Sequence, residues 1–156
     1  MSKLFTIFVV ALLILSYNIA LAQSEEEAVI TTVQKFFDAM SASDTSATLA
    51  VLFREGQYFS IREDSSQISI WNTTHTEYLN KLSTSNEKWL EKMRKPEVFV
   101  HDRVAILWTK YDFYRNGQWS HCGVDAFSLL KTAEGWKIVG FVYNVETKDC
   151  DKLTDN

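Results

Sequence analysis

The chain has 156 residues, with 16 basic and 20 acidic side chains and a formal charge of −4 at pH 7. Its length and 46% hydrophobic content are typical of one compact domain, and Pro96 is its single proline. The acidic balance, with no basic cluster interleaved with aromatic residues, argues against a nucleic-acid partner, because the phosphate backbone would be repelled.

The first 22 residues are interpreted as a targeting segment that takes no part in folding. Lys3 precedes an apolar run from Leu4 to Leu15, and Ala20-Leu21-Ala22 supplies a small-x-small cleavage site before Gln23. The apolar run is short for a membrane span, although an uncleaved N-terminal anchor is the alternative. We therefore predict an exported protein, periplasmic or secreted after cleavage at Ala22-Gln23, in which residues 23–156 form a single domain without a stable membrane span.

Helices are predicted at the start of this domain. Ser24 and Glu27 form a capping box, with acidic residues at the positive end of a helix. Apolar residues then recur at helical spacing, which predicts an amphipathic helix over residues 25–41. Asp44 can cap a second, short helix, whose apolar residues are Leu49, Leu52 and Phe53.

A strand pair and a third helix follow. Residues 57–61 and 67–71 are predicted as strands around a polar turn at 63–66. Thr74 and Glu77 form another capping box, which opens the third helix.

Four long strands are predicted in the last part of the domain, the first of them beginning at Glu97. Asn116-Gly117 indicates a two-residue hairpin, because a type I′ turn needs positive φ at both positions and these residues tolerate it. Ala133-Glu134-Gly135 marks a second turn before a strand over 136–143. Helices followed by a curled antiparallel sheet predict an α+β domain, with the sheet wrapped around the first helix.

Two cysteines follow the targeting segment, Cys122 and Cys150. Export permits a disulfide, and an even count with no third thiol is consistent with one. Such a bridge would close a loop of about 28 residues and stabilise the fold by roughly 3–4 kcal/mol. The alternative is a buried free thiol at Cys122, which lies within a predicted strand.

The order of helix, helix, hairpin, helix and four strands resembles the nuclear transport factor 2-like superfamily over nearly all of residues 23–156. Within it, several motifs resemble the SnoaL-like and lumazine-binding-like branch of exported bacterial proteins: Phe36-Phe37-Asp38-Ala39-Met40, Asp44, Leu52-Phe53, Tyr111-Asp-Phe-Tyr114, His121-Cys-Gly-Val-Asp-Ala-Phe127 and Gly135-Trp-Lys-Ile-Val139. The resemblance implies a cone-shaped α+β fold with the N-terminal helices packed in a curved antiparallel sheet. It does not select an activity, because the superfamily hosts isomerases, dehydratases, cyclases and proteins with no known chemistry.

The register of the Asn116-Gly117 hairpin predicts which side chains share one face. With these two residues as the loop, His121 lies opposite Asp112 and Asp125 lies opposite Trp108. The face then has an apolar floor that grades into a polar rim, which suits a concave pocket. The floor comprises Val104, Ile106, Phe127, Leu129, Ile138 and Val142, and the rim comprises Trp108, Lys110, Asp112, His121 and Asp125.

His121 is the candidate for acid–base chemistry. Asp112 or Asp125 could orient its imidazole and raise its pKa, which would suit a general acid or base. Alternatively, Lys110, Asp112 and His121 form a solvated cross-strand charge cluster. His121, Asp112 and Asp125 are therefore candidates, and no catalytic residue is assigned.

The predicted ligand pocket combines polar and aromatic side chains: Phe36, Trp71, Tyr78, Trp108, Lys110, Asp125 and Phe127. No cofactor is expected, since the chain contains no phosphate-binding loop or related motif. No metal site is expected either, because the histidines show no ligand spacing with the cysteines. The resemblance places Phe36 and Ile61 where steroid-isomerase members carry a catalytic Tyr and Asp, so that mechanism is not expected.

The leading functional hypothesis is an exported, non-catalytic pocket protein that binds a small apolar or partly aromatic molecule. The rival is a cyclase, dehydratase or isomerase that uses His121 with Asp112 or Asp125. The third hypothesis is a dimeric interaction module without a ligand. A homodimer through the sheet is expected because one face is too apolar for open water: Leu107, Thr109, Tyr111, Phe113, Val124, Ala126, Phe141 and Tyr143.

Overall fold

The computed structural model describes residues 24–148 and Cys150. The predicted targeting segment, residues 1–22, lies outside this part, as do residues 23, 149 and 151–156. Among the described residues, no helix is both long and apolar enough to cross a membrane.

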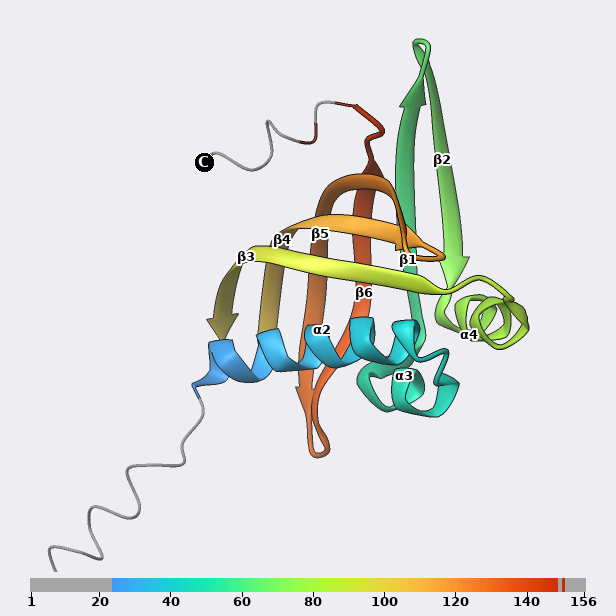
Figure 1. The fold of residues 1–156 in the computed structure, drawn as a ribbon. Coiled ribbons are helices and arrows are strands. Elements are labelled where there is room, and N and C mark those ends of the chain that lie inside the picture. The colour runs from blue at the N-terminus through green and yellow to red at the C-terminus, as the bar shows by residue number, and fades with distance from the viewer. Residues whose placement is uncertain (1–23, 149, 151–156) are drawn as a thin grey trace, which may run out of the picture.

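In the described part of the chain, three helices and six strands form an α+β fold around one curved sheet, as predicted. The strand order is β2-β1-β6-β5-β4-β3, and the β1–β6 pair is parallel while the other pairs are antiparallel. Figure 1 shows α2 lying across the concave side of the sheet, with α3 and α4 near one end. In chain order the elements are α2 (Glu25–Ser41), α3 (Thr45–Val51), β1 (Leu52–Asp64), β2 (Gln67–Thr74), α4 (His75–Thr84), β3 (Trp89–His101), β4 (Val104–Arg115), β5 (Gln118–Thr132) and β6 (Gly135–Val145).

The predicted helix starts are confirmed by their caps. The Ser24 hydroxyl accepts from the Glu27 N–H at 3.1 Å while the Glu27 carboxylate accepts from the Ser24 N–H, and Thr74 forms the same box with Glu77. Each box satisfies backbone donors that a helix start leaves unpaired. These caps fix where α2 and α4 begin, and so which of their faces meets the sheet.

Two element boundaries differ from the prediction. The helix α3 ends at Val51, and Leu52 is already extended as the first residue of β1. The strand β3 begins at Trp89 rather than at Glu97, and its pairing with β4 is irregular between Arg94 and Glu97. Proline has no N–H for the ladder, so this interruption at Pro96 concealed the first half of the strand.

The β4–β5 hairpin confirms the turn but not the register beyond it. Asn116 and Gly117 have positive φ, and Tyr114 pairs with Trp119 as predicted. Ser120 then forms a bulge, so that His121 pairs with Phe113 and not with Asp112. A one-residue shift moves every following partner to the opposite face, so the prediction that Trp108, Lys110 and Asp112 share a face with His121 is wrong.

The core lies between α2 and the concave face of the sheet. Phe37 packs edge-on against Phe127 at 5.8 Å between ring centroids, and Tyr58 stacks on Phe141 at 4.7 Å. The predicted floor is right for Phe127, Leu129 and Ile138, which are buried. It is wrong for its other three members, which are about half exposed on the convex face: Val104, Ile106 and Val142.

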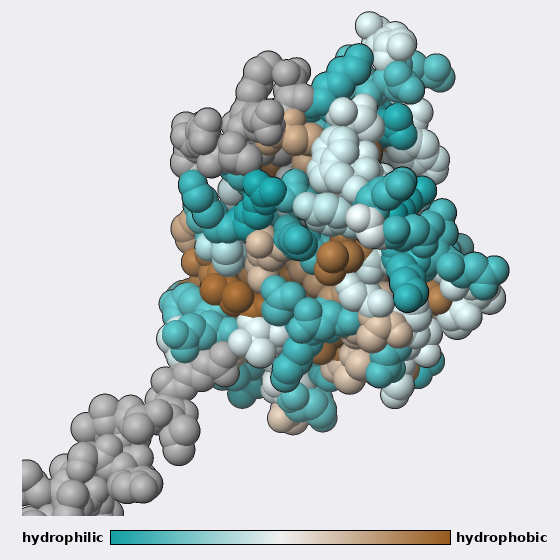
Figure 2. All heavy atoms as spheres, in the orientation of Figure 1, coloured by the Kyte–Doolittle hydropathy of each residue, from teal (hydrophilic) through white to brown (hydrophobic). Residues whose placement is uncertain are grey.

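The exterior of the face that carries α2 is mostly hydrophilic. Figure 2 shows apolar residues gathered mainly at its left edge, near the end of β3. On the convex side of the sheet, Cys122 is joined to Cys150 by a disulfide, with 5.9 Å between their Cα atoms. This bridge fastens the segment after β6 to the middle of β5, where Cys122 also pairs with Glu146 through two backbone hydrogen bonds.

Candidate functional site

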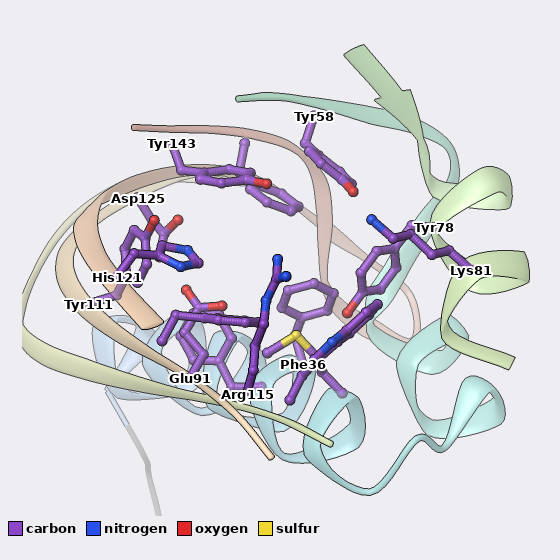
Figure 3. A pocket seen from close by; sticks show the side chains of 15 residues that line it. Phe36, Tyr58, Tyr78, Lys81, Glu91, Tyr111, Arg115, His121, Asp125 and Tyr143 are labelled. Carbon is purple, nitrogen blue, oxygen red and sulfur yellow. The ribbon is translucent and has the colours of Figure 1, made fainter. Parts of the chain in front are cut away.

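A cavity of about 110 Å³ lies between the concave face of the sheet and the helices α2 and α4. Figure 3 shows labelled polar side chains from β3, β4, β5 and α4 turned toward it. It is smaller than most ligand pockets, for which roughly 300–1,000 Å³ is usual, and suits a group of about one aromatic ring. Its walls are mainly aromatic, and the lining residues are Phe36, Phe37, Met40, Tyr58, Tyr78, Lys81, Trp89, Glu91, Tyr111, Phe113, Arg115, His121, Asp125, Phe141 and Tyr143.

A pair of carboxyl groups stands out in this aromatic setting. Asp125 is 2% exposed, and Glu91 turns its carboxyl group inward from β3 and hydrogen-bonds to Asp125. Burial raises the pKa of Asp125 to about 7. Burial and the neighbouring Asp125 charge raise the pKa of Glu91 well above its ordinary value. Two buried acids that hydrogen-bond to each other cannot both ionise easily, so we expect the pair to share a proton near neutral pH.

Tyr111 closes one side of the acid pair. Its hydroxyl donates to the Asn144 carbonyl at 2.8 Å, across the strand β5. Gly123 makes this possible, because a side chain there would overlap both the Asn144 carbonyl and the Tyr111 ring. Burial raises the pKa of Tyr111 far above its ordinary value, so the phenol stays protonated.

Tyr78 presents a polar atom without a partner. Its hydroxyl is buried, and within the described part of the chain it makes no hydrogen bond. One carboxylate oxygen of Asp125, Oδ2, is also buried and makes no hydrogen bond within the described part of the chain. Buried polar atoms are normally paired, so these two groups can serve an occupant of the cavity.

His121 sits between Tyr111 and Phe113 at the cavity wall. It stacks on Phe113 at 4.8 Å, and its Nδ1 lies 3.0 Å from the Ser120 hydroxyl. Burial and the nearby positive charge of Arg115 lower the pKa of His121 to about 4. The prediction that a carboxylate raises this pKa is wrong. The Ser120 bulge separates His121 from Asp112, and the pKa of His121 is lowered although Asp125 lines the same cavity. The imidazole is neutral at pH 7.

A second hollow adjoins the cavity at its mouth and is called the vestibule below. It has a volume of about 440 Å³ and shares Tyr58, Lys81, Arg115, His121 and Tyr143 with the cavity. The remaining residues are mostly polar: Ser60, Arg62, Trp71, Thr73, Ser120, Val145 and Thr147.

The structure brings together part of the predicted pocket. Phe36, Tyr78 and Asp125 line the cavity, and Phe127 packs beneath it against Phe36. Trp71 lies at the vestibule, half exposed.

Trp108, Lys110 and Asp112 do not reach the cavity. Trp108 lines a groove on the convex face, and Asp112 forms an ion pair with Arg94 there. Lys110 pairs in register with Arg94 and Val124 and is nearly buried. The prediction that these three residues line the pocket is wrong, because the bulge at Ser120 shifts the register and leaves them on the convex face. Ile61 also faces outward, so it does not occupy a catalytic position in the cavity.

Sequence reasoning missed Glu91, Arg115 and Lys81. Glu91 was overlooked because the first half of β3 was not predicted. A signal was present in the alternation of Trp89, Glu91 and Met93, which places a lone acid between two large apolar residues at strand spacing.

Among the described residues no group of three or more potential metal ligands is found.

An aromatic cavity under a curved sheet defines a pocket-forming α+β protein. Residues 24–144 match the family described as "Putative lumazine-binding", and the chain belongs to this family within the nuclear transport factor 2-like superfamily. A comparison with curated protein sequences found no significant match.

Solved structures of the superfamily are similar in fold. A nuclear transport factor 2-like protein from Cytophaga hutchinsonii superposes with a TM-score of 0.67 at 7% identity, over 79% of this chain and 99% of that one. A superfamily protein from Salmonella enterica serovar Typhimurium gives 0.62 at 15% identity, over 80% and 93% of the two chains. A protein with a cystatin-like fold from Novosphingobium aromaticivorans gives 0.63 at 11% identity, over 96% and 94%. At these identities the likeness establishes the fold.

Proposed function

We propose that the protein binds a small, partly aromatic molecule in the cavity and does not transform it. The observation that carries the proposal is the aromatic cavity with the Glu91–Asp125 pair at its wall. Aromatic walls favour a planar apolar group, and a few convergent polar atoms fix its orientation. The unpartnered Tyr78 hydroxyl and Asp125 oxygen supply that polar recognition.

A fragment screen by NMR tests this proposal. Single-ring compounds, such as phenol and benzamide, should bind saturably and shift the signals of Phe36, Tyr78 and Phe141. The matched control is Phe36→Trp, in which a larger ring fills the space and should reduce the binding. A screen in which no single-ring fragment perturbs these residues would contradict the proposal.

Proton-transfer catalysis is a second candidate function, of the isomerase or dehydratase type. The carboxyl pair favours it, because one member can donate a proton while the other accepts one near neutral pH. The variants His121→Ala and Asp125→Asn separate the two functions. If the protein only binds its ligand, each substitution should weaken the binding free energy by the contribution of one hydrogen bond, roughly 0.5–1.5 kcal/mol. An enzyme should lose about 10²–10⁴-fold in turnover with little change in binding.

Export remains part of the proposal. The disulfide between Cys122 and Cys150 supports an oxidising compartment, in agreement with the leader-like residues 1–22. Detection of the protein with Gln23 as its N-terminus in a periplasmic or secreted fraction is the expected result, and full-length protein in the cytoplasm would contradict it.

We also propose a homodimer through the convex face of the sheet. Of the residues expected at the dimer face, Val124 and Ala126 line a groove on this side. Tyr111, Phe113 and Phe141 face inward, and the convex face instead exposes other large apolar side chains. They surround a groove of about 470 Å³ that includes Phe59, Ile61, Ile70, Trp108 and Val142. Ile70→Asp should convert a dimer to a monomer in sedimentation analysis, whereas a monomeric parent protein would contradict the proposal.

A further inference from the structure

Positive charge gathers at the mouth of the cavity. Arg62 from β1, Lys81 from α4 and Arg115 from the end of β4 all line the vestibule. In Figure 3, Arg115 from β4 and Lys81 from α4 extend toward the middle of the view. Three elements that are distant in sequence therefore place cations around one hollow.

These cations are poorly neutralised by the protein. Within the described residues, neither Lys81 nor Arg115 forms an ion pair with a carboxylate. Lys81 lies over the Trp89 ring at 5.6 Å, and Arg115 lies over the Phe113 ring at 6.0 Å. Arg62 has only a long contact of 3.8 Å with Asp64, and both side chains are substantially exposed. Such charges remain available to a ligand.

The inner end of the cavity is lined by acidic side chains instead of cations. Glu91 and Asp125 share it with aromatic rings, and a negative ligand group would be repelled there. A molecule that enters would therefore keep its neutral ring inside and its negative group outside. The vestibule also offers hydroxyl donors from Thr73, Ser120 and Thr147 to such a group.

We propose that the vestibule binds the anionic group of the ligand, so that the protein recognises a small aromatic acid whose ring occupies the cavity and whose carboxylate meets Arg62, Lys81 and Arg115. This inference rests on the proposed binding function and adds the chemical class of the ligand. It also assigns Arg115 and Lys81 as the residues that determine specificity.

The test compares two probes of nearly the same shape, the anion 3-phenylpropanoate and the neutral 3-phenylpropanamide, in which an NH2 group replaces one carboxylate oxygen. Isothermal titration on the parent protein should show the acid binding about tenfold or more tightly than the amide, as expected for a hydrogen bond to a charged group. Arg115→Gln and Lys81→Gln should bring this ratio toward one, because each should weaken the binding of the acid more than the binding of the amide. Lys35→Gln removes the same charge from α2, away from both hollows, and should keep the ratio.

The affinities of the two probes test the inference about the vestibule separately from the proposed binding function. Equal affinities for the two probes in the parent would overturn the inference and leave the proposed binding function standing. A preference for the acid that survives in both vestibule variants would also overturn it. If neither probe binds, the proposed function and the inference both fail. Should a variant not fold, the parent alone decides, because the ratio must fall as salt is raised if exposed cations create it.

Discussion

The two faces of the β4–β5 strand pair each hold a buried aspartate, and the two differ in what surrounds them. On the convex face Asp112 is neutralised by Arg94, which makes it part of the structure. On the concave face Asp125 has a second acid, Glu91, and aromatic rings beside it, and no cation pairs with it among the described residues. A counter-ion offsets the cost of burying a charged carboxylate, whereas burial without one favours the protonated form.

Removing the disulfide should have the largest effect on the convex face. Cys122→Ser together with Cys150→Ser releases a loop of 28 residues, which should lower the free energy of unfolding by roughly 3–4 kcal/mol in denaturant titrations. Ligand binding in the cavity should persist, because the bridge lies on the other face. Mass spectrometry without reductant should find the parent two protons lighter than its reduced form, and two freely alkylated cysteines would contradict the bridge.

Breaking the ion pair on the convex face should have the next largest effect. Arg94→Met leaves Asp112 buried without its partner and should destabilise the protein by about 2–3 kcal/mol, less than a fully buried pair because Arg94 is 44% exposed. The matched control Arg103→Met removes an exposed arginine and should cost well under that amount. Equal losses in the two variants would show that the ion pair has no special role.

The inner aspartate should make stability depend on pH in the opposite sense to an ion-paired carboxylate. Its folded pKa is raised from 3.8 to about 7, so its contribution is favourable below pH 4 and is lost as pH rises through 7. Asp125→Asn should therefore gain stability relative to the parent over this window, by up to about 1.4 kcal/mol per pH unit. His75 and His121 have lowered pKa values and act in the other direction, but they contribute equally to both proteins. Parallel stability curves would contradict the raised pKa.

His121 should have the smallest effect on stability. Its ring stacks on Phe113, and its one hydrogen-bonding neighbour is the Ser120 hydroxyl. His121→Phe keeps the ring and should change the midpoint of urea unfolding only slightly, whereas His121→Ala should leave a cavity and cost more. A loss in His121→Phe that matches His121→Ala would mean that the polar atoms of the imidazole matter more than its packing.

Sequence patterns predicted the helices, strands and turns more accurately than they predicted which side chains share one face of the sheet. The capping boxes at Ser24 and Thr74 and the Asn116-Gly117 turn are local signals, and the structure confirms each of them. The bulge at Ser120 has no comparable signal, because serine has no special backbone preference and the residues around it alternate regularly. That single insertion exchanged the predicted partners of His121 and moved Asp112 to the other face.

The acid pair could not be predicted for a related reason. Asp125 is among the predicted pocket residues, but Glu91 comes from the first half of β3, which Pro96 concealed. Their meeting depends on the curvature of the sheet and on Gly123, which leaves the space that the Tyr111 ring fills. Such contacts between distant strands follow from tertiary packing and not from local pattern.

The most direct test of the contrast between the two aspartates is a carboxyl NMR titration of the protein labelled with ¹³C at aspartate and glutamate side chains. Asp125 should titrate with an apparent pKa of about 7, Glu91 should stay protonated above its ordinary range, and Glu91→Gln should move the Asp125 transition. An Asp125 signal that titrates near its ordinary value of 3.8, unchanged in Glu91→Gln, would contradict the shared proton and the distinction between the two faces.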